Sequence, residues 1–154
     1  MTIKIIASRL STPDVEGYPD KVSFVDADTG TILKSFSRFG TNPNPVHPGT
    51  LAKWQTVYAQ IALGTYNYAC FNSPKHGKCL MLNGLAAIPT TLPNMNPQTA
   101  NPGMNTAEDV EVHCGFSDGW RGSEACQTVF PEDWPDFVGY FAMGDTGIYI
   151  LQQG

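Results

Sequence analysis

The stretch "KVSFVDADTGTILKSFS", residues 21–37, decides the fold class of this chain. Two runs that alternate apolar and polar residues flank "DADTG", whose Asp and Gly residues favour a turn. This pattern predicts two strands joined in a hairpin. Similar strand patterns occur in four further runs: "IKIIA" (3–7), "GTYNYACFNS" (64–73), "DVEVHCG" (109–115) and "TGIYILQQ" (146–153). The chain is therefore predicted to be mostly β.

One or two helices are expected beside these strands. "PGTLAKWQTVYAQIA", residues 48–62, repeats apolar residues at helical spacing behind a proline, which predicts an amphipathic helix. "PEDWPDFVGYFA", residues 131–142, predicts a shorter helix with proline in its first turn. Residues 83–105 hold four prolines and many Asn residues without periodicity, so a long ordered Asn/Pro-rich loop is expected. Loops of this length in a compact domain usually form lids or binding walls.

Length and composition limit the classes of protein that fit. At 154 residues, the chain is expected to be a single domain spanning 1–154 and to act as a monomer. Hydrophobic residues make up 42% and charged residues 15%, which is typical of a packed globule. The net charge of −5, with no run of Lys or Arg, argues against nucleic acid as a partner. No stretch is long and apolar enough to predict a membrane span, and the N-terminus lacks the apolar core of a signal peptide.

The four cysteines are expected to be thiols, because they are too few for a disulfide scaffold in a chain of this length. A bridge between Cys70 and Cys79 stays open as an alternative in an oxidising compartment. The segment "VHCGFSDGWRGSEACQ", residues 112–127, brings a histidine close to two cysteines in sequence. Zinc fits this segment badly, because the adjacent His113 and Cys114 would point to opposite faces of a strand. No metal and no cofactor are expected.

A cysteine nucleophile fits the same segment better. Cys126 lies in a polar, glycine-containing turn, and His113 lies near a strand end from which its imidazole could take the thiol proton. The alternative is ordinary packing of a buried cysteine and a buried histidine. His47 and His76 both lie in turn sequences and are expected to be solvated loop histidines.

The order of motifs resembles that of the L,D-transpeptidase catalytic domain, a family of cysteine enzymes that act on peptidoglycan. The resemblance covers most of the chain and lies in five motifs: "FVDADTGTILKSF" (24–36), "ALGTYNYAC" (62–70), "VEVHCG" (110–115), "SEACQT" (123–128) and "TGIYIL" (146–151). It implies a β-sandwich with one or two helices. It also implies transpeptidase, carboxypeptidase or endopeptidase chemistry on peptidoglycan stem peptides.

The resemblance assigns roles to individual residues. Cys126 would be the nucleophile that forms a thioester, His113 the base, and Ser123 the residue that shapes the nucleophile turn. The backbone N–H groups of Ala125 and Cys126 would hold the oxyanion. Apart from the resemblance, Trp120 lies between His113 and Cys126 in sequence, where a tryptophan either packs in the core or forms a wall of the binding site.

Two departures from the family pattern leave a second interpretation open. Glu124 and Ala125 stand where the family has His-Gly, and Thr128 stands where it has Arg or Asn. Arg121 could replace the missing cation in binding a substrate carboxylate, and Glu124 could bind a substrate amine. The alternative is a non-catalytic module of the same fold that binds glycopeptide or a partner protein. Either protein is expected to act in the periplasm or cell wall, and to be delivered by phage lysis or a secretion system or to be cytoplasmic before release.

Overall fold

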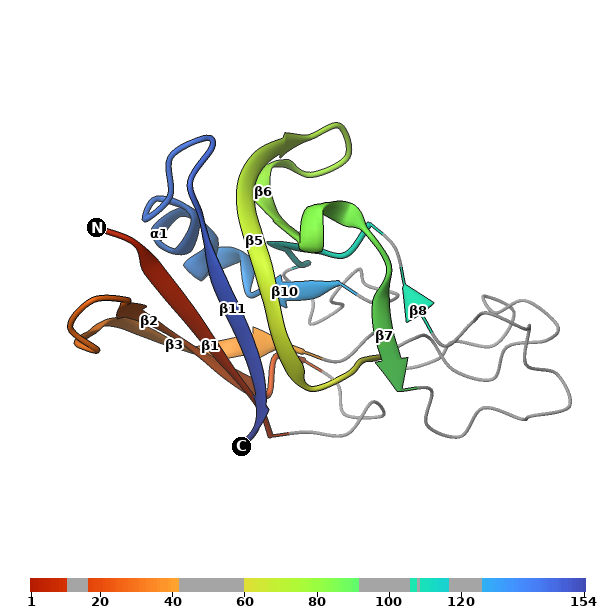
Figure 1. The fold of residues 1–154 in the computed structure, drawn as a ribbon, viewed down its shortest axis with the longest axis horizontal. Helices are drawn as coiled ribbons and strands as arrows, with labels where there is room; N and C mark the ends of the chain where they lie inside the picture. Colours follow the sequence, from red (N-terminus) through yellow and green to blue (C-terminus); the bar gives the residue numbers. More distant parts are fainter. Residues whose placement is uncertain (11–16, 42–59, 92–105, 108, 117–125) are drawn as a thin grey trace, which may run out of the picture.

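The computed structural model describes residues 1–10, 17–41, 60–91, 106–107, 109–116 and 126–154. Most of these residues form a closed β-barrel, which Figure 1 shows with the N- and C-terminal strands side by side. The barrel strands are β1 (Ile3–Arg9), β2 (Asp20–Asp26), β3 (Ile32–Gly40), β5 (Gly64–Ser73), β6 (Gly77–Leu82), β9 (Glu111–Cys114), β10 (Gln127–Val129) and β11 (Thr146–Gln153).

The strand order around the barrel is β1-β11-β5-β6-β9-β10-β3-β2, and β2 pairs with β1 to close it. β1 pairs with β11 in parallel, as does β9 with β10, and the other barrel pairs are antiparallel. A separate small sheet has the order β4 (Gln60–Ile61), β7 (Ile88–Thr91) and β8 (Thr106–Ala107).

The expected β-sandwich is wrong, although the mostly β composition is confirmed. A sandwich leaves edge strands on each of its two sheets, whereas here β1 pairs on both sides, with β11 and β2. β10 likewise pairs on both sides, with β9 and β3. Every strand of the eight-stranded sheet has a neighbour on both sides, so this sheet has no edge strand.

The predicted helices correspond to little helix in the described part of the chain. Most of the 48–62 helix lies outside the described residues, and residues 60–61, at its end, form strand β4 instead. The 131–142 segment is shorter in helix than predicted: a 3₁₀ turn, η2 (Pro131–Asp133), leads into α1 (Trp134–Val138). The start of the predicted 83–105 loop contains the 3₁₀ turn η1 (Asn83–Leu85) and β7, and residues 92–105 lie outside the described residues.

The β2–β3 turn forms as the sequence predicts. The carboxylate of Asp26 accepts hydrogen bonds from the backbone N–H groups of Asp28 and Thr29, at 2.9 and 3.3 Å. Gly30 adopts a φ of +74°, in the left-handed region that glycine enters without steric cost. The carboxylate of Asp26 therefore accepts hydrogen bonds from turn N–H groups that have no backbone carbonyl within reach.

An aromatic cluster fills one end of the barrel. α1 places Phe137, which is fully buried, against Phe24, Phe36 and Phe39, with ring centroids 4.7 to 6.2 Å apart. Phe141, just after this helix, packs on Phe24 as well. The short helix therefore acts as an apolar plug, and burial of several aromatic rings provides much of the hydrophobic stabilisation of this end.

A polar network fills the opposite end of β1. Arg9 donates to the hydroxyl and the carbonyl oxygen of Thr41, at 3.1 and 2.9 Å, and to the carbonyl oxygen of Ile61, at 3.0 Å. The buried carboxylate of Asp20 accepts from the backbone N–H and the hydroxyl of Thr41, at 2.8 and 2.6 Å. The network therefore joins β1, β2 and the small sheet through Thr41, which bonds both the guanidinium of Arg9 and the buried carboxylate of Asp20.

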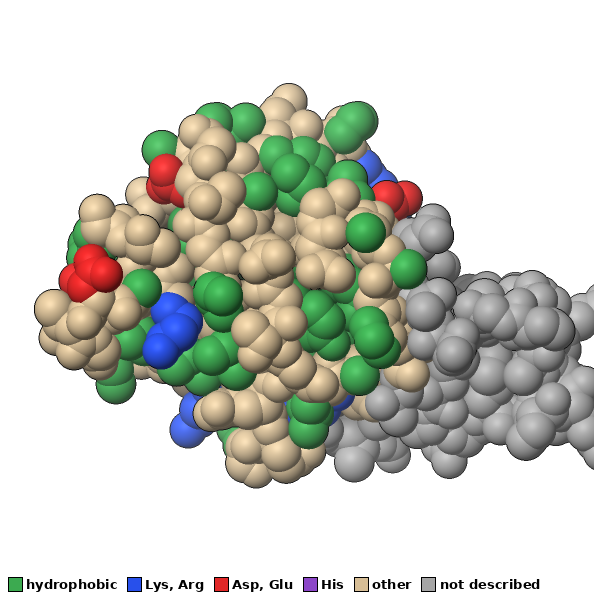
Figure 2. All heavy atoms as spheres, in the orientation of Figure 1, with side chains coloured by type: hydrophobic (Ala, Val, Ile, Leu, Met, Phe, Trp, Pro, Cys, Tyr) green, Lys and Arg blue, Asp and Glu red, His purple; other side chains and the backbone are tan. Residues whose placement is uncertain are grey.

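The surface carries few charges on the face seen in Figure 2. Lys, Arg, Asp and Glu side chains appear there as isolated groups between apolar and uncharged polar atoms.

No helix in the described residues is both long and apolar enough to cross a membrane.

Candidate functional site

The outer face of β9 carries the candidate site. Val112 belongs to the buried core inside the barrel. Because neighbouring residues of a strand alternate between faces, Glu111 and His113 point outward. Both are nevertheless buried, with 8% and 2% of their surfaces exposed. A carboxylate and an imidazole that face outward and are covered mark this face as different from an ordinary solvated strand surface.

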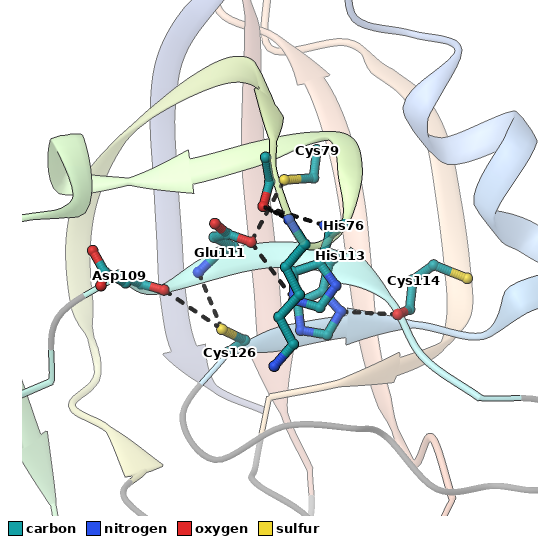
Figure 3. A network of polar contacts seen from close by, with 9 residues as sticks. His76, Cys79, Asp109, Glu111, His113, Cys114 and Cys126 are labelled. Atoms are coloured by element: carbon teal, nitrogen blue, oxygen red, sulfur yellow. Dashed lines mark hydrogen bonds and ion pairs between the residues drawn. The ribbon is translucent and has the colours of Figure 1, made fainter.

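Strand β10 brings the nucleophile candidate to the same place. β9 and β10 pair in parallel, with Thr128 beside His113 and Gln127 beside Val112. Cys126 directly precedes β10, and its sulfur accepts a hydrogen bond from the backbone N–H of Glu111 at 3.3 Å. The thiol also lies 3.8 Å from the carbonyl oxygen of Asp109. Figure 3 shows Cys126 and His113 on neighbouring strands within one cluster of polar side chains.

His113 is held by its own strand end and by a second histidine. Its Nδ1 lies 2.8 Å from the carbonyl oxygen of Cys114, which can only accept, so Nδ1 carries the proton and Nε2 is the basic nitrogen. Its ring stacks on His76, with ring centroids 3.8 Å apart and planes 5° from parallel. Burial lowers the pKa of His113 to about 4, and the positive charges that His76 and Lys75 can carry act in the same direction.

The β5–β6 hairpin supplies His76. The hydroxyl of Ser73 accepts from the backbone N–H groups of Lys75 and His76, each at 3.3 Å, and Gly77 turns the chain with a φ of +69°. The Nε2 atom of His76 lies 3.8 Å from a carboxylate oxygen of Glu111. His76 lies in a turn, as expected, but only 21% of its side chain is exposed and its ring packs on His113, so it is not a freely solvated histidine. His47 lies outside the described residues.

Glu111 is the centre of the cluster. The same carboxylate oxygen that faces His76 accepts from the thiol of Cys79 at 3.7 Å. Burial, together with the charge of Glu111, raises the pKa of Cys79 to about 12. Sequence reasoning missed Glu111, His76 and Cys79, because the strand "GKCLML" at 77–82 was not predicted. If strand 77–82 had been predicted and paired with strand 111–114, these three residues would have been placed together.

Cys126 is a neutral thiol in this environment. Burial raises its pKa to about 11, and the charges of Glu111 and Asp109 add to this. The backbone N–H of Glu111 and the ammonium of Lys75 act in the opposite direction and offset only part of the rise. In the resting site, both Cys126 and His113 are therefore uncharged at neutral pH.

Thr128 adds an unusual feature to the same face. It is fully buried, and its hydroxyl oxygen has no hydrogen-bond partner among the residues that the structure describes. Buried hydroxyl groups almost always have a partner, because leaving one unpaired costs about 1–3 kcal/mol. The Thr128 hydroxyl, beside His113 in the parallel register, is therefore a polar group for which a ligand or a water could be the partner.

The structure brings together some of the residues predicted from sequence. Cys126, His113 and Thr128 lie on one outer face of the barrel. The other predicted residues lie outside the described residues: Trp120, Arg121, Ser123, Glu124 and Ala125. Cys114 is partly exposed because β9 ends there, and its sulfur contacts the carbonyl oxygen of Gly115 at 3.4 Å.

All four cysteines are free thiols. Cys70 points into the core and pairs with Leu80, whereas Cys79 points to the outer face and contacts Glu111. A Cys70–Cys79 bridge is thus absent, since the two side chains lie on opposite faces of neighbouring strands.

Neither a search for metal-binding clusters nor comparison with known proteins adds a function to this site. In the part of the chain that the structure describes, no three or more His, Cys, Asp or Glu side chains are arranged to hold a metal ion. Comparison with protein-family models, with curated proteins and with solved structures found no match for this chain.

Proposed function

We propose that this protein is a cysteine-dependent enzyme that modifies peptidoglycan stem peptides, with Cys126 as nucleophile and His113 as general base. The observation that supports this most is the parallel register of β9 and β10, which gathers the thiol, the imidazole and Glu111 on one outer face. The motif order supports a divergent relationship to L,D-transpeptidase catalytic domains, whose five motifs this chain resembles. Its substrate would place its action in the periplasm or cell wall, where a phage lysin or a delivered effector also works.

The proposed reaction is acyl transfer through a thioester. Nε2 of His113 takes the thiol proton while the sulfur of Cys126 attacks the amide carbonyl between an L- and a D-centre, and a C–S bond forms. When the tetrahedral intermediate collapses, the C–N bond breaks and His113 returns the proton to the leaving amine. Water or an acceptor amine then attacks the thioester, and its proton returns to the sulfur through His113. No oxidant or metal is needed for this balance.

The protonation states of the resting site constrain the first step. Because the pKa of Cys126 lies near 11 and that of His113 near 4, the proton stays on sulfur until substrate arrives. Proton transfer and attack on the carbonyl must then occur together, with the negative charge passing directly to the carbonyl oxygen. An unliganded enzyme of this kind is expected to be slow toward general alkylating reagents.

The direct test uses muropeptides and mass spectrometry. Purified protein is expected to remove D-alanine, cut cross-links or exchange the terminal amino acid, and Cys126→Ala is expected to abolish the change. Cys70→Ala is the matched control, since it also removes a thiol but one that points into the core. Folding of each variant is checked by thermal melting. Unchanged muropeptides with folded wild-type protein, or full activity in Cys126→Ala, would contradict the proposal.

A second candidate is a binding module that holds glycopeptide or a partner protein without chemistry. The raised pKa of Cys126 and the lowered pKa of His113 favour it, because a binding site has no need of an ionised thiol. Thiol alkylation followed by peptide mapping distinguishes the two after muropeptide is added. If the protein is an enzyme, added muropeptide is expected to acylate Cys126 or to protect it selectively from alkylation. If it is a binding module, the Cys126→Ala variant is expected to bind muropeptide as tightly as the wild-type protein does, and no thioester forms.

A further inference from the structure

The β5–β6 hairpin contributes a second imidazole to the cluster, and the proposed reaction does not yet use it. His76 lies flat against His113, at 3.8 Å between ring centroids and 5° between planes. This contact joins residues far apart in sequence, and Figure 3 shows the two rings together beside Glu111. A stacked pair of flat rings restricts rotation of both side chains, because turning either ring out of the plane would open the contact.

His76 is itself fixed from two sides. Its backbone N–H donates to the hydroxyl of Ser73 at 3.3 Å, which fixes the hairpin turn on which it sits. Its Nε2 faces the carboxylate of Glu111 at 3.8 Å. Glu111 lies on the same strand and the same face as His113, two residues away, and its backbone N–H bonds the sulfur of Cys126. One carboxyl residue thus holds the second imidazole and touches the nucleophile.

We propose that His76 is a positioning residue of this site: its imidazole, held between His113 and Glu111, fixes the ring plane of His113. In that plane, Nδ1 stays on the carbonyl oxygen of Cys114, and Nε2 remains the nitrogen that can accept the thiol proton. The catalytic part of this role rests on the proposed function. The contact of His76 with His113 and Glu111, called the clamp below, is independent of any activity.

The stacking also has an electrostatic consequence. Among the described residues, the titratable groups around His113 include His76 and Lys75 on the hairpin, Glu111 on its own strand, and the thiols of Cys79 and Cys126, which both contact Glu111. Two cationic rings in face-to-face contact repel, so protonation of His76 beside Glu111 disfavours a charge on His113. Burial is the main cause of the lowered pKa of His113, and the charge that His76 can carry lowers it further. The stacked His76 therefore adds to the burial that keeps His113 neutral, and able to accept a proton, into acidic solution.

The test compares two substitutions of His76. His76→Phe keeps a flat ring that can stack but has no ring nitrogen, and His76→Ala removes the ring. We expect His76→Ala to lower kcat for muropeptide turnover about tenfold or more with little change in KM, because a general base that is no longer held loses its alignment. His76→Phe is expected to keep most of the wild-type kcat. Thermal melting confirms that both variants are folded.

A second readout does not depend on activity. The imidazole resonances of His113 are followed by NMR during a pH titration, and His76→Ala is expected to raise the pKa of His113 toward that of a free imidazole. An unchanged titration in His76→Ala overturns the proposal, as does a kcat in His76→Phe as low as that in His76→Ala. If wild-type protein changes no muropeptide while the titration shifts as expected, the proposed function falls and the clamp stands.

Discussion

Thr128 is the residue at which the candidate site most clearly departs from ordinary packing. Its hydroxyl is buried without a partner among the described residues. We expect Thr128→Val to leave the free energy of unfolding unchanged or to raise it by about 1 kcal/mol, because the unpaired hydroxyl is replaced by a methyl group of similar size. Urea unfolding measures the difference.

Thr41→Val is the matched control for that substitution. The Thr41 hydroxyl accepts from Arg9 and donates to Asp20, so its removal is expected to cost about 1–3 kcal/mol. If Thr128→Val destabilises the protein as much as Thr41→Val does, the Thr128 hydroxyl has a hydrogen-bond partner in the folded protein. The interpretation that this hydroxyl is unpaired would then be refuted.

The protonation of His113 predicts how stability depends on pH. Its folded pKa, near 4, lies below the unfolded value of about 6.5, so the unfolded chain binds more protons between these limits. Stability is therefore complete above about pH 6.5 and is lost as the pH falls toward 4, by an amount on the order of 2–3 kcal/mol. Urea unfolding across this range measures the slope. His113→Gln should flatten it, and parallel curves for the two proteins would refute the assignment.

At the scale of single elements, the end of β9 depends on one glycine. A Cβ atom on Gly115 would lie 1.8 Å from the hydroxyl oxygen of Tyr18, which bonds the carbonyl oxygen of Phe116 at 3.0 Å. Gly115→Ala must therefore displace the Tyr18 ring, and we expect a loss of about 1–3 kcal/mol. In a Tyr18→Ala background the same substitution should cost almost nothing. This double-mutant cycle fails if the cost of Gly115→Ala is equal in both backgrounds.

The elements that sequence predicted are those with a local pattern. The 64–73 and 146–153 strands and the 21–37 hairpin are confirmed, because alternation and turn residues lie within each segment. β6 and β10 were missed, since "GKCLML" has no alternation and "QTV" is too short to show any. His76 was misjudged for a related reason: "SPKHGK" has the composition of a solvated turn, and only long-range pairing folds this turn onto β9.

The site was predictable only in part, for the same physical reason. A cysteine in a polar turn after a strand that carries histidine suggested Cys126 and His113. Their common face follows from parallel pairing of β9 with β10, which no local pattern encodes. The pKa of Cys126 is raised, because burial outweighs the backbone N–H group that stabilises its sulfur. Burial depends on packing between segments that are far apart in sequence, so it could not be predicted from the residues next to Cys126.

At the scale of the whole molecule, three neighbouring strands of the barrel meet in a close contact at β11. The hydroxyl of Tyr68 on β5 donates to the carbonyl oxygen of Ile3 on β1, across the intervening strand. A Cβ atom on Gly147 would lie 2.6 Å from the Tyr68 ring and 2.7 Å from that carbonyl oxygen. The small residue on β11 thus leaves room for a side chain that ties its two neighbours together.

The buried charge pair at the other end of the barrel predicts the largest change in stability. Arg9 holds Thr41 and Ile61, and Gln127, the residue after Cys126, donates to the same Thr41 carbonyl at 3.1 Å. Arg9→Met would leave the buried carboxylate of Asp20 without its opposite charge, so we expect a loss of about 3–5 kcal/mol in urea unfolding.

Arg38→Met is the control for this prediction, since it removes an arginine of the same kind from the surface. Arg38 bonds Asp133 at 2.7 Å, but 43% of its side chain is exposed, and such pairs contribute about 1 kcal/mol or less. Equal losses in the two variants would mean that the Arg9 network is not buried in solution. A larger loss in Arg9→Met, accompanied by faster alkylation of Cys126, would show that the network also holds β10 in the register on which the candidate site depends.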